Sequence, residues 1–177
     1  MRHLPITAPI LALAIAVGLV VQVSAQAQEA APITCRDVPA TIIGTAGDDS
    51  IIGTSGRDVI QALAGDDRVA GIAGDDLICG STHDDRLTGG NGKDDVFGES
   101  GNDEVRGGGG DDPRVVGGSG DDQVFGGAGN DHVFGAAGND HLFGGDGDDT
   151  LDGGDGFDVC SPGPGSNVVV NCEQVIR

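Results

Sequence analysis

The sequence predicts an all-β solenoid of very short parallel strands, and three observations lead to this fold class. A nonapeptide with glycine at positions one and four, aspartate at position six and an aliphatic residue at position eight recurs in register. The 177 residues include 34 glycines and carry a formal net charge of −20, and Trp and Tyr are absent. A chain of that composition with no regular sequence pattern is typically disordered. Repetition in register indicates a stack of similar units instead.

The amino terminus has the features of a secretory signal peptide over residues 1–27. Arg2 precedes a mainly apolar run at 10–23, and Ala25-Gln26-Ala27 fits a cleavage site. A membrane anchor is the alternative, but this run is short of the roughly 20 residues that span a bilayer. Cleavage would remove Arg2 and no acidic residue, which takes the formal charge from −20 to −21. We therefore expect a chain without a membrane span, secreted outside the cell or into the periplasm.

Residues 28–43 form a lead segment, in which residues 41–43 are expected to be a first strand that caps the array. The array follows over residues 44–161 as about 13 units. Twelve units follow the nonapeptide length, and the eighth is one residue longer, with Pro113 as the insertion. Residues 162–177 form a carboxy-terminal cap with a closing strand. Caps are expected because an open sheet edge recruits other chains.

Each position of the nonapeptide predicts a local structure. Glycine permits the positive φ angles of a tight turn, predicted over positions one to six. Positions seven to nine, one aliphatic residue between two mostly polar ones, predict a very short strand with one side inward. The inward residues at position eight are Ile51, Ile60, Val69, Ile78, Leu87, Val96, Val105, Val115, Val124, Val133, Leu142, Leu151 and finally Cys160.

Two consecutive units make one coil, so strands stack in two parallel sheets and turns stack along two edges. Position six is aspartate in every unit. The odd units place Asp49, Asp67, Asp85, Asp103, Asp122, Asp140 and Asp158 on one edge, and the even units place Asp58, Asp76, Asp94, Asp112, Asp131 and Asp149 on the other. Neighbours along an edge lie about 4.8 Å apart, the spacing of paired strands, at which like charges repel.

Stacked carboxylates predict a bound cation, and Ca²⁺ fits best. Carboxylates and turn carbonyls form an oxygen-only cage, and Ca²⁺ takes six to eight oxygens with tolerance for irregular geometry. Mg²⁺ requires a tighter octahedron, and Zn²⁺ prefers the nitrogen and sulfur ligands that the array lacks. We expect multiple Ca²⁺ ions, held at the 13 aspartates of position six, and folding coupled to their binding.

The units "GGAGNDHVF" and "GGDGDDTLD" match the pattern G-G-x-G-x-D-x-U-x, and the chain resembles the RTX, or haemolysin-type, calcium-binding repeat proteins. The resemblance covers about two thirds of the chain. It implies a right-handed parallel β-roll in which position-six aspartates and backbone carbonyls hold Ca²⁺ between turns. Position two is glycine mainly in the later units, so the amino-terminal turns are expected to be less regular. His83 replaces a turn glycine and Pro113 breaks the spacing, so the sites that include Asp85 and Asp112 are the least expected to bind Ca²⁺.

Four cysteines suit an oxidising compartment and allow three pairings. The stretch between Cys160 and Cys172 contains prolines and glycines that can turn the chain back, which favours this bridge. Cys35 with Cys79 then follows by elimination. That bridge requires the amino-terminal segment to fold back over a sheet, because Cys79 lies about two coils along the array.

Catalytic and nucleic-acid functions are disfavoured. The sequence has no nucleophile motif, and 13 copies of one environment argue against an acid–base pair, which needs a unique site. His132 and His141 occupy equivalent positions of adjacent units, hence opposite sheets. A charge of −21 repels phosphate. The chain is therefore not expected to be an enzyme.

Phenylalanines at position nine, Phe97, Phe125, Phe134 and Phe143, are expected to point away from the interior. Packing against the ladder is the first explanation, and a contact surface for another chain or a glycan is the second. Two functions stay open. The chain is either a secreted calcium-binding protein or a calcium-stabilised module for cell-surface adhesion, polysaccharide, protein partners or self-association.

Overall fold

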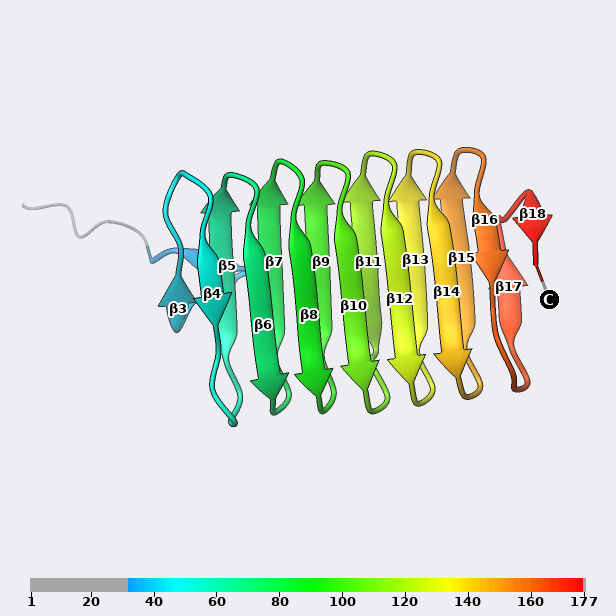
Figure 1. The fold of residues 1–177 in the computed structure, drawn as a ribbon, viewed down its shortest axis with the longest axis horizontal. Coiled ribbons are helices and arrows are strands. Elements are labelled where there is room, and N and C mark those ends of the chain that lie inside the picture. Colours follow the sequence, from blue (N-terminus) through cyan, green and yellow to red (C-terminus); the bar gives the residue numbers. More distant parts are fainter. Residues whose placement is uncertain (1–31, 177) are drawn as a thin grey trace, which may run out of the picture. The chain divides into compact units, whose positions relative to one another are not determined.

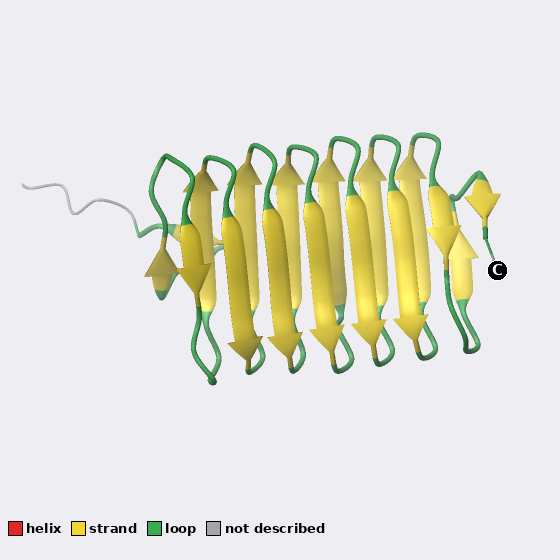
Figure 2. Cartoon of the chain, viewed as in Figure 1, coloured by secondary structure: helices red, strands yellow, loops and turns green. Residues whose placement is uncertain are grey.

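The computed structural model describes residues 32–176, and the predicted signal peptide over residues 1–27 lies outside the described residues. Residues 32–177 form one compact unit. Every regular element in the described part is a strand, as Figure 2 shows. No helix in this part is long and apolar enough to cross a membrane. The predicted all-β class is confirmed.

The repeats form strands of nearly constant length. They are β1 (Thr34–Cys35), β2 (Val38–Pro39), β3 (Ile42–Ile43), β4 (Ser50–Ile52), β5 (Val59–Ala64), β6 (Arg68–Ala73), β7 (Leu77–Thr82), β8 (Arg86–Asn91), β9 (Asp95–Ser100), β10 (Glu104–Gly109), β11 (Arg114–Ser119), β12 (Gln123–Ala128), β13 (His132–Ala137), β14 (His141–Asp146), β15 (Thr150–Asp155), β16 (Val159–Ser161), β17 (Val168–Val170) and β18 (Gln174–Val175).

Two parallel sheets of eight strands make the roll, with strand orders β18-β16-β14-β12-β10-β8-β6-β4 and β17-β15-β13-β11-β9-β7-β5-β3. Odd and even repeats therefore alternate between the sheets, as predicted (Figure 1). Each strand pairs with the strand one coil away, and equivalent positions of the two repeats align. Val105, for example, aligns with Val124, and Leu87 with Val105.

Most strands are about twice as long as predicted, and the turns are correspondingly shorter. A strand runs from position seven through position three of the next repeat, which leaves positions four to six as the turn. The paired register skips position one: Arg106 aligns with Phe125 and Gly108 with Gly127. The sequence pattern predicted a turn over positions one to six because positions one and four carry glycine. At position two, Gly108 has φ 127°, and a Cβ there would collide with the backbone of Gly90 in the neighbouring strand.

The core lies between the sheets and is built from position eight, as predicted. All thirteen position-eight side chains form one buried cluster, and Ile42, Val169 and Cys172 pack against its ends. Most of these side chains are fully buried. Because each coil contributes only two such residues, the core is a narrow column rather than a broad layer.

The insertion at Pro113 leaves the register intact. Arg114 still aligns with Asp95 and Val115 with Val96, while the intervening turn holds one extra residue. Arg114 also pairs with Asp95 through two hydrogen bonds of 2.9 and 2.6 Å. An insertion in a turn is absorbed locally because the sheets on either side define where the next strand must begin.

The carboxy-terminal end contains more of the repeat than the sequence pattern predicted. Residues 162–170 form a fourteenth unit, with Asn167 at position six and Val169 at position eight, and β17 pairs with β15. β18 then pairs with β16 and closes the other sheet. The predicted bridge between Cys160 and Cys172 is present, with Cα atoms 6.1 Å apart. The leading strand predicted at residues 41–43 is β3.

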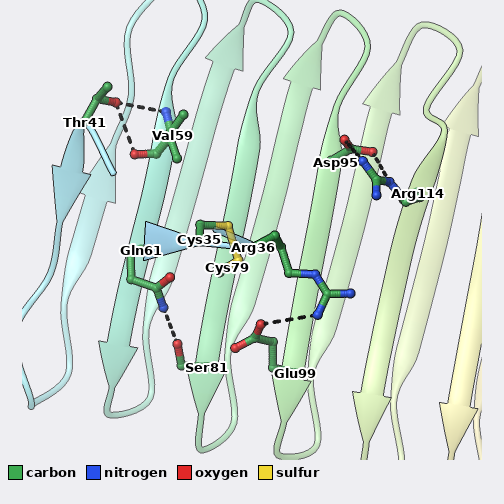
Figure 3. The surroundings of a disulfide bond; sticks show 10 residues. All are labelled: Cys35, Arg36, Thr41, Val59, Gln61, Cys79, Ser81, Asp95, Glu99 and Arg114. Carbon is green, nitrogen blue, oxygen red and sulfur yellow. Dashed lines mark hydrogen bonds and ion pairs between the residues drawn. A yellow bond between two sulfur atoms is a disulfide. The ribbon is translucent and has the colours of Figure 1, made fainter. Parts of the chain in front are cut away.

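The amino-terminal hairpin β1–β2 covers part of one sheet (Figure 3). Cys35 forms the predicted disulfide with Cys79, with Cα atoms 5.7 Å apart. Around it, Val59, Leu77 and Phe97 form a second buried cluster on the outer face of the sheet. Phe97 points away from the interior as predicted, yet it is 2 % exposed because the hairpin lies over it.

Candidate functional site

The aspartates at position six form a continuous ladder along each edge of the roll. The backbone N–H of one aspartate donates to Oδ1 of the aspartate in the next coil, at 2.8–2.9 Å throughout. Twelve of the thirteen side chains are buried, and Asp49 is half-buried. The structure thus brings together all thirteen residues of the predicted site, seven on one edge and six on the other.

Only one oxygen of most of these carboxylates has a partner. Oδ2 is buried without any hydrogen bond in eleven of them: Asp67, Asp76, Asp85, Asp94, Asp103, Asp112, Asp122, Asp131, Asp140, Asp149 and Asp158. Leaving a buried polar atom unsatisfied costs about 1–3 kcal/mol, and more for a charged group. Eleven equivalent orphans in one repeated position indicate a missing positive partner rather than eleven separate defects.

Ten of the eleven orphan oxygens face the glycine at position one of their own repeat. A Cβ added at Gly126 would lie 2.6 Å from Oδ2 of Asp131 and 2.6 Å from the carbonyl oxygen of Gly144 in the next coil. A side chain at this position would therefore occupy space that two oxygens already line. This close approach favours glycine at position one.

Burial raises the pKa of these carboxyls, because the charged form loses its water. The pKa rises to about 7 for Asp85, Asp112 and Asp122, and to about 6 for Asp94, Asp103, Asp131 and Asp140. It is also raised for Asp67, Asp76 and Asp149. The N–H of the neighbouring aspartate opposes the shift but does not cancel it. Without a bound cation, burial therefore destabilises the charged form of these carboxyls.

The first turn on each edge differs from the rest. Asp49 Oδ2 accepts the backbone N–H of Thr45 at 2.6 Å and its hydroxyl at 3.0 Å, and Thr54 does the same for Asp58. In the third to fourteenth repeats the residue at position two has positive φ, even where it is Leu63 or Ile72, whereas Thr45 and Thr54 do not. The left-handed conformation thus accompanies the turns in which no N–H reaches Oδ2.

The two turns that depart from the repeat pattern, those of Asp85 and Asp112, keep the ladder. His83 takes φ 81° where other repeats have glycine, yet Asp85 still accepts from Asp67 and donates to Asp103. Asp112 spans the Pro113 insertion by donating to Asp131, 19 residues away. Both Oδ2 atoms are orphaned like those of regular turns. Substitution and insertion in these turns leave the carboxylate positions unchanged.

A second ladder at position five was not predicted. The Oδ1 atoms of Asp48, Asp66, Asp75, Asp84, Asn102, Asp111, Asp121, Asn130, Asn139 and Asp148 each accept the backbone N–H of position five in the following coil, at 2.7–3.3 Å. This ladder runs in the opposite direction to that of position six. The signal was present in the sequence, since ten of thirteen units carry Asp or Asn at position five.

The donor set decides which cation fits. Among residues 32–176 no group of three or more His, Cys, Asp or Glu side chains could hold a metal ion. A cation at an orphan oxygen must therefore take most of its ligands from backbone carbonyls and water. An all-oxygen set with few carboxylates suits Ca²⁺ and excludes a thiolate or imidazole site for Zn²⁺.

Other candidate side chains lie apart from the turns. His132 is in β13 and His141 in β14, which belong to opposite sheets, as predicted. Phe125 and Phe143 stack with ring centroids 4.7 Å apart, and the guanidinium of Arg106 lies 4.0 Å from the centroid of the Phe125 ring. Packing along the sheet accounts for this stack.

Comparison with protein-family models identifies the repeats directly. The model described as the RTX calcium-binding nonapeptide repeat (4 copies) matches residues 43–78, 80–112, 114–142, 126–160 and 134–169. No curated protein matches the chain. The matched segments span nearly all of the two sheets and reach into the fourteenth unit, which contains Asn167. On its repeat, its fold and its aspartate ladders, the chain belongs to the RTX calcium-binding nonapeptide repeat family.

Proposed function

We propose that this chain is a secreted calcium-binding protein whose β-roll folds as Ca²⁺ binds at the stacked turns. The observation that carries the proposal is the set of eleven buried, unpartnered Oδ2 atoms. Calcium would supply the positive charge that these oxygens lack. Position-six aspartates would hold the ions together with turn carbonyls, and the chain would act by binding rather than by catalysis.

In this proposal calcium has a large effect on folding. Without it, folding buries carboxyls whose pKa is raised to about 6 or 7, so burial of their charged form costs free energy. A ligand that binds only the folded chain stabilises it by about 2.7 kcal/mol per site when its concentration is 100 times Kd. Eleven such turns make the folded state strongly dependent on calcium. Folding and binding then occur together.

Secretion is supported by the two disulfides, which persist in oxidising compartments. Extracellular calcium modules bind Ca²⁺ with a Kd of about 10⁻⁴–10⁻³ M, so sites of this kind fill outside the cell, where calcium is abundant. The chain would leave the cytoplasm unfolded and fold where calcium and oxidant are both available. Pulse-chase labelling with analysis of the culture medium tests this step.

A titration tests the binding proposal. The purified chain, starting in EDTA, is titrated with CaCl₂ while far-UV circular dichroism is recorded, and MgCl₂ serves as the control. We expect a cooperative gain in β signal and a rise in Tm above its value in EDTA with calcium only, and bound calcium in the folded fraction by elemental analysis. A chain that is fully β-structured in EDTA and binds no calcium would contradict the proposal.

A further inference from the structure

Asn167 occupies the position of an aspartate in the last repeat. It lies at position six of the fourteenth unit, and its Oδ1 accepts the backbone N–H of Asp149 at 2.7 Å. This is the same bond that position-six aspartates make through Oδ1 with the preceding coil. The side-chain Nδ2 of Asn167 therefore stands where the other turns have Oδ2.

The amide nitrogen changes the chemistry of that place. Nδ2 of Asn167 donates to the carbonyl oxygen of Pro162 at 3.2 Å and to that of Gly163 at 3.0 Å, which are positions one and two of its own turn. In an aspartate turn, Oδ2 takes the place of this donor; it has no hydrogen to share and is buried without a partner. An N–H₂ group brings the positive partial charge to these carbonyls that a cation brings elsewhere.

At the amino-terminal end of the roll, other donors satisfy Oδ2 of the first two turns. Thr45 and Thr54 satisfy Oδ2 of Asp49 and Asp58 through their N–H and hydroxyl groups. The turns that need no cation are thus the first, the second and the fourteenth. They bracket the eleven turns with an orphan oxygen.

We propose that Asn167 ends the calcium array on its edge by placing a protein donor where the other turns bind Ca²⁺. The inference rests on the proposed function and deepens it, since it states which turns bind and which do not. Asn167 is a specificity-determining residue in this scheme: its amide excludes a cation that a carboxylate at the same place would attract.

Asn167→Asp should therefore open a further calcium site in the last turn. The substituted carboxylate keeps Oδ1 for Asp149 and turns Oδ2 toward the carbonyls of Pro162 and Gly163. The turn borders an open hollow of about 870 Å³, whose lining includes Ser161, Pro162, Gly163, Asn167, Val175 and Ile176. This space admits the ion and the water molecules that complete its coordination.

The experiment compares the full chain with two variants, Asn167→Asp and Asn167→Ala. Bound calcium per chain is measured by elemental analysis after equilibrium dialysis, and Tm is measured in EDTA and in excess CaCl₂. For Asn167→Asp we expect one more calcium per chain, a lower Tm in EDTA and a higher Tm in calcium than the parent chain. The reversal of sign is specific, because a structural defect lowers Tm in both conditions.

Asn167→Ala is the matched control, since it removes the amide without adding a carboxylate. We expect an unchanged calcium count and a lower Tm in both conditions. If the parent binds calcium but Asn167→Asp binds no more, or loses stability in calcium, this inference is overturned while the proposed function stands. If the parent binds no calcium, the proposed function itself fails.

Discussion

The coils beneath the amino-terminal hairpin and those beyond it are stabilised in different ways. The clasped coils, residues 42–100, have two apolar clusters: the position-eight column inside, and a second cluster outside that includes Val59, Leu77 and Phe97. In the open coils, residues 114–161, the inner column is the main apolar cluster, although Val116 packs against the outer cluster. Their outer face carries the Phe125–Phe143 stack, and Phe143 is 36 % exposed.

The two regions also differ in which residues hold the positive φ at position two. The clasped coils hold Leu63, Ile72, Ser81 and Glu99 at positive φ in position two, where the open coils have glycine except at Ala136. The left-handed conformation costs a residue other than glycine roughly 1–2 kcal/mol. The outer cluster and the disulfide offset that strain. The comparison teaches that this repeat can be held by apolar burial from a neighbouring segment, or by glycine geometry together with bound cations.

Calcium removal should have the largest effect and should separate the two regions. In EDTA the open coils lose the charge compensation on which they depend, while the clasped coils keep the hairpin, the outer cluster and the disulfide. Hydrogen exchange followed by mass spectrometry should show protection lost first over residues 114–161, by several kcal/mol. Simultaneous loss along the whole roll would show instead that the regions form one cooperative unit.

Acidification should partly replace calcium in both regions. The folded-state pKa of Asp122, in the open coils, is about 7, and that of Asp94, in the clasped coils, is about 6, against a usual value of 3.8. Between these values the folded chain binds more protons than the unfolded chain, so metal-free stability is lost as pH rises from about 4 to about 7. We expect a higher Tm in EDTA at pH 5 than at pH 7.5, and weaker calcium binding at pH 5 because protons compete. A metal-free Tm that rises with pH would contradict this assignment.

Removal of the amino-terminal disulfide should make the clasped coils resemble the open ones. The bridge between Cys35 and Cys79 closes a loop across 44 residues, and the chain-entropy model gives about 4 kcal/mol for a loop of that size. The double variant Cys35→Ala with Cys79→Ala should lose protection over residues 42–100 in EDTA. Denaturant unfolding measures the change, and Cys160→Ala with Cys172→Ala is the comparison at the other end.

Asparagine substitutions at two aspartates should differ in their effect in EDTA. Asp122→Asn replaces an orphan oxygen with a donor, as Asn167 does naturally, and should stabilise the metal-free roll by about 1–3 kcal/mol. Asp58→Asn can keep its amide oxygen toward the N–H and hydroxyl of Thr54, because within residues 32–176 no N–H of a neighbouring coil holds Oδ1 of Asp58, and should leave the metal-free stability nearly unchanged. Thermal unfolding in EDTA measures both. Equal stabilisation by the two substitutions would show that charge alone, and not the pairing of Oδ2, governs these turns.

The phenylalanine stack should contribute least. Phe143→Ser removes one half of the 4.7 Å stack from the open coils and should cost about 0.5–1.5 kcal/mol beyond the lost burial. Phe97→Ser in the clasped coils removes a side chain that is 2 % exposed and should cost more. Denaturant midpoints in saturating calcium compare the two. If sedimentation shows that Phe143→Ser changes an assembly of the protein, the stack has a contact role as well.

Much of the site could be predicted because it is encoded within single repeats. The position of Asp122, for example, follows from its own nonapeptide and from the coil of two repeats. Asn167 escaped prediction because its unit, "PGPGSNVVV", lacks both the first glycine and the aspartate. Thr45 and Thr54 could be read as ordinary departures from glycine, since nothing local shows that their N–H groups reach the carboxylate at position six of the same repeat.

The sequence by itself determined the coil of two repeats, the two sheets, the inner column at position eight and the two ladders of aspartates, because each of these follows from a period repeated in every unit. The tertiary structure alone decided the rest: the longer strands, the hairpin that buries Phe97, and the division between eleven orphaned carboxylates and the turns that satisfy themselves. The physical reason is that strand length and burial depend on which groups of other coils lie opposite, and these groups are at least one whole coil away along the chain. The pairing of Oδ2 depends instead on the backbone conformation at position two of the same repeat, which the residue type alone does not reveal.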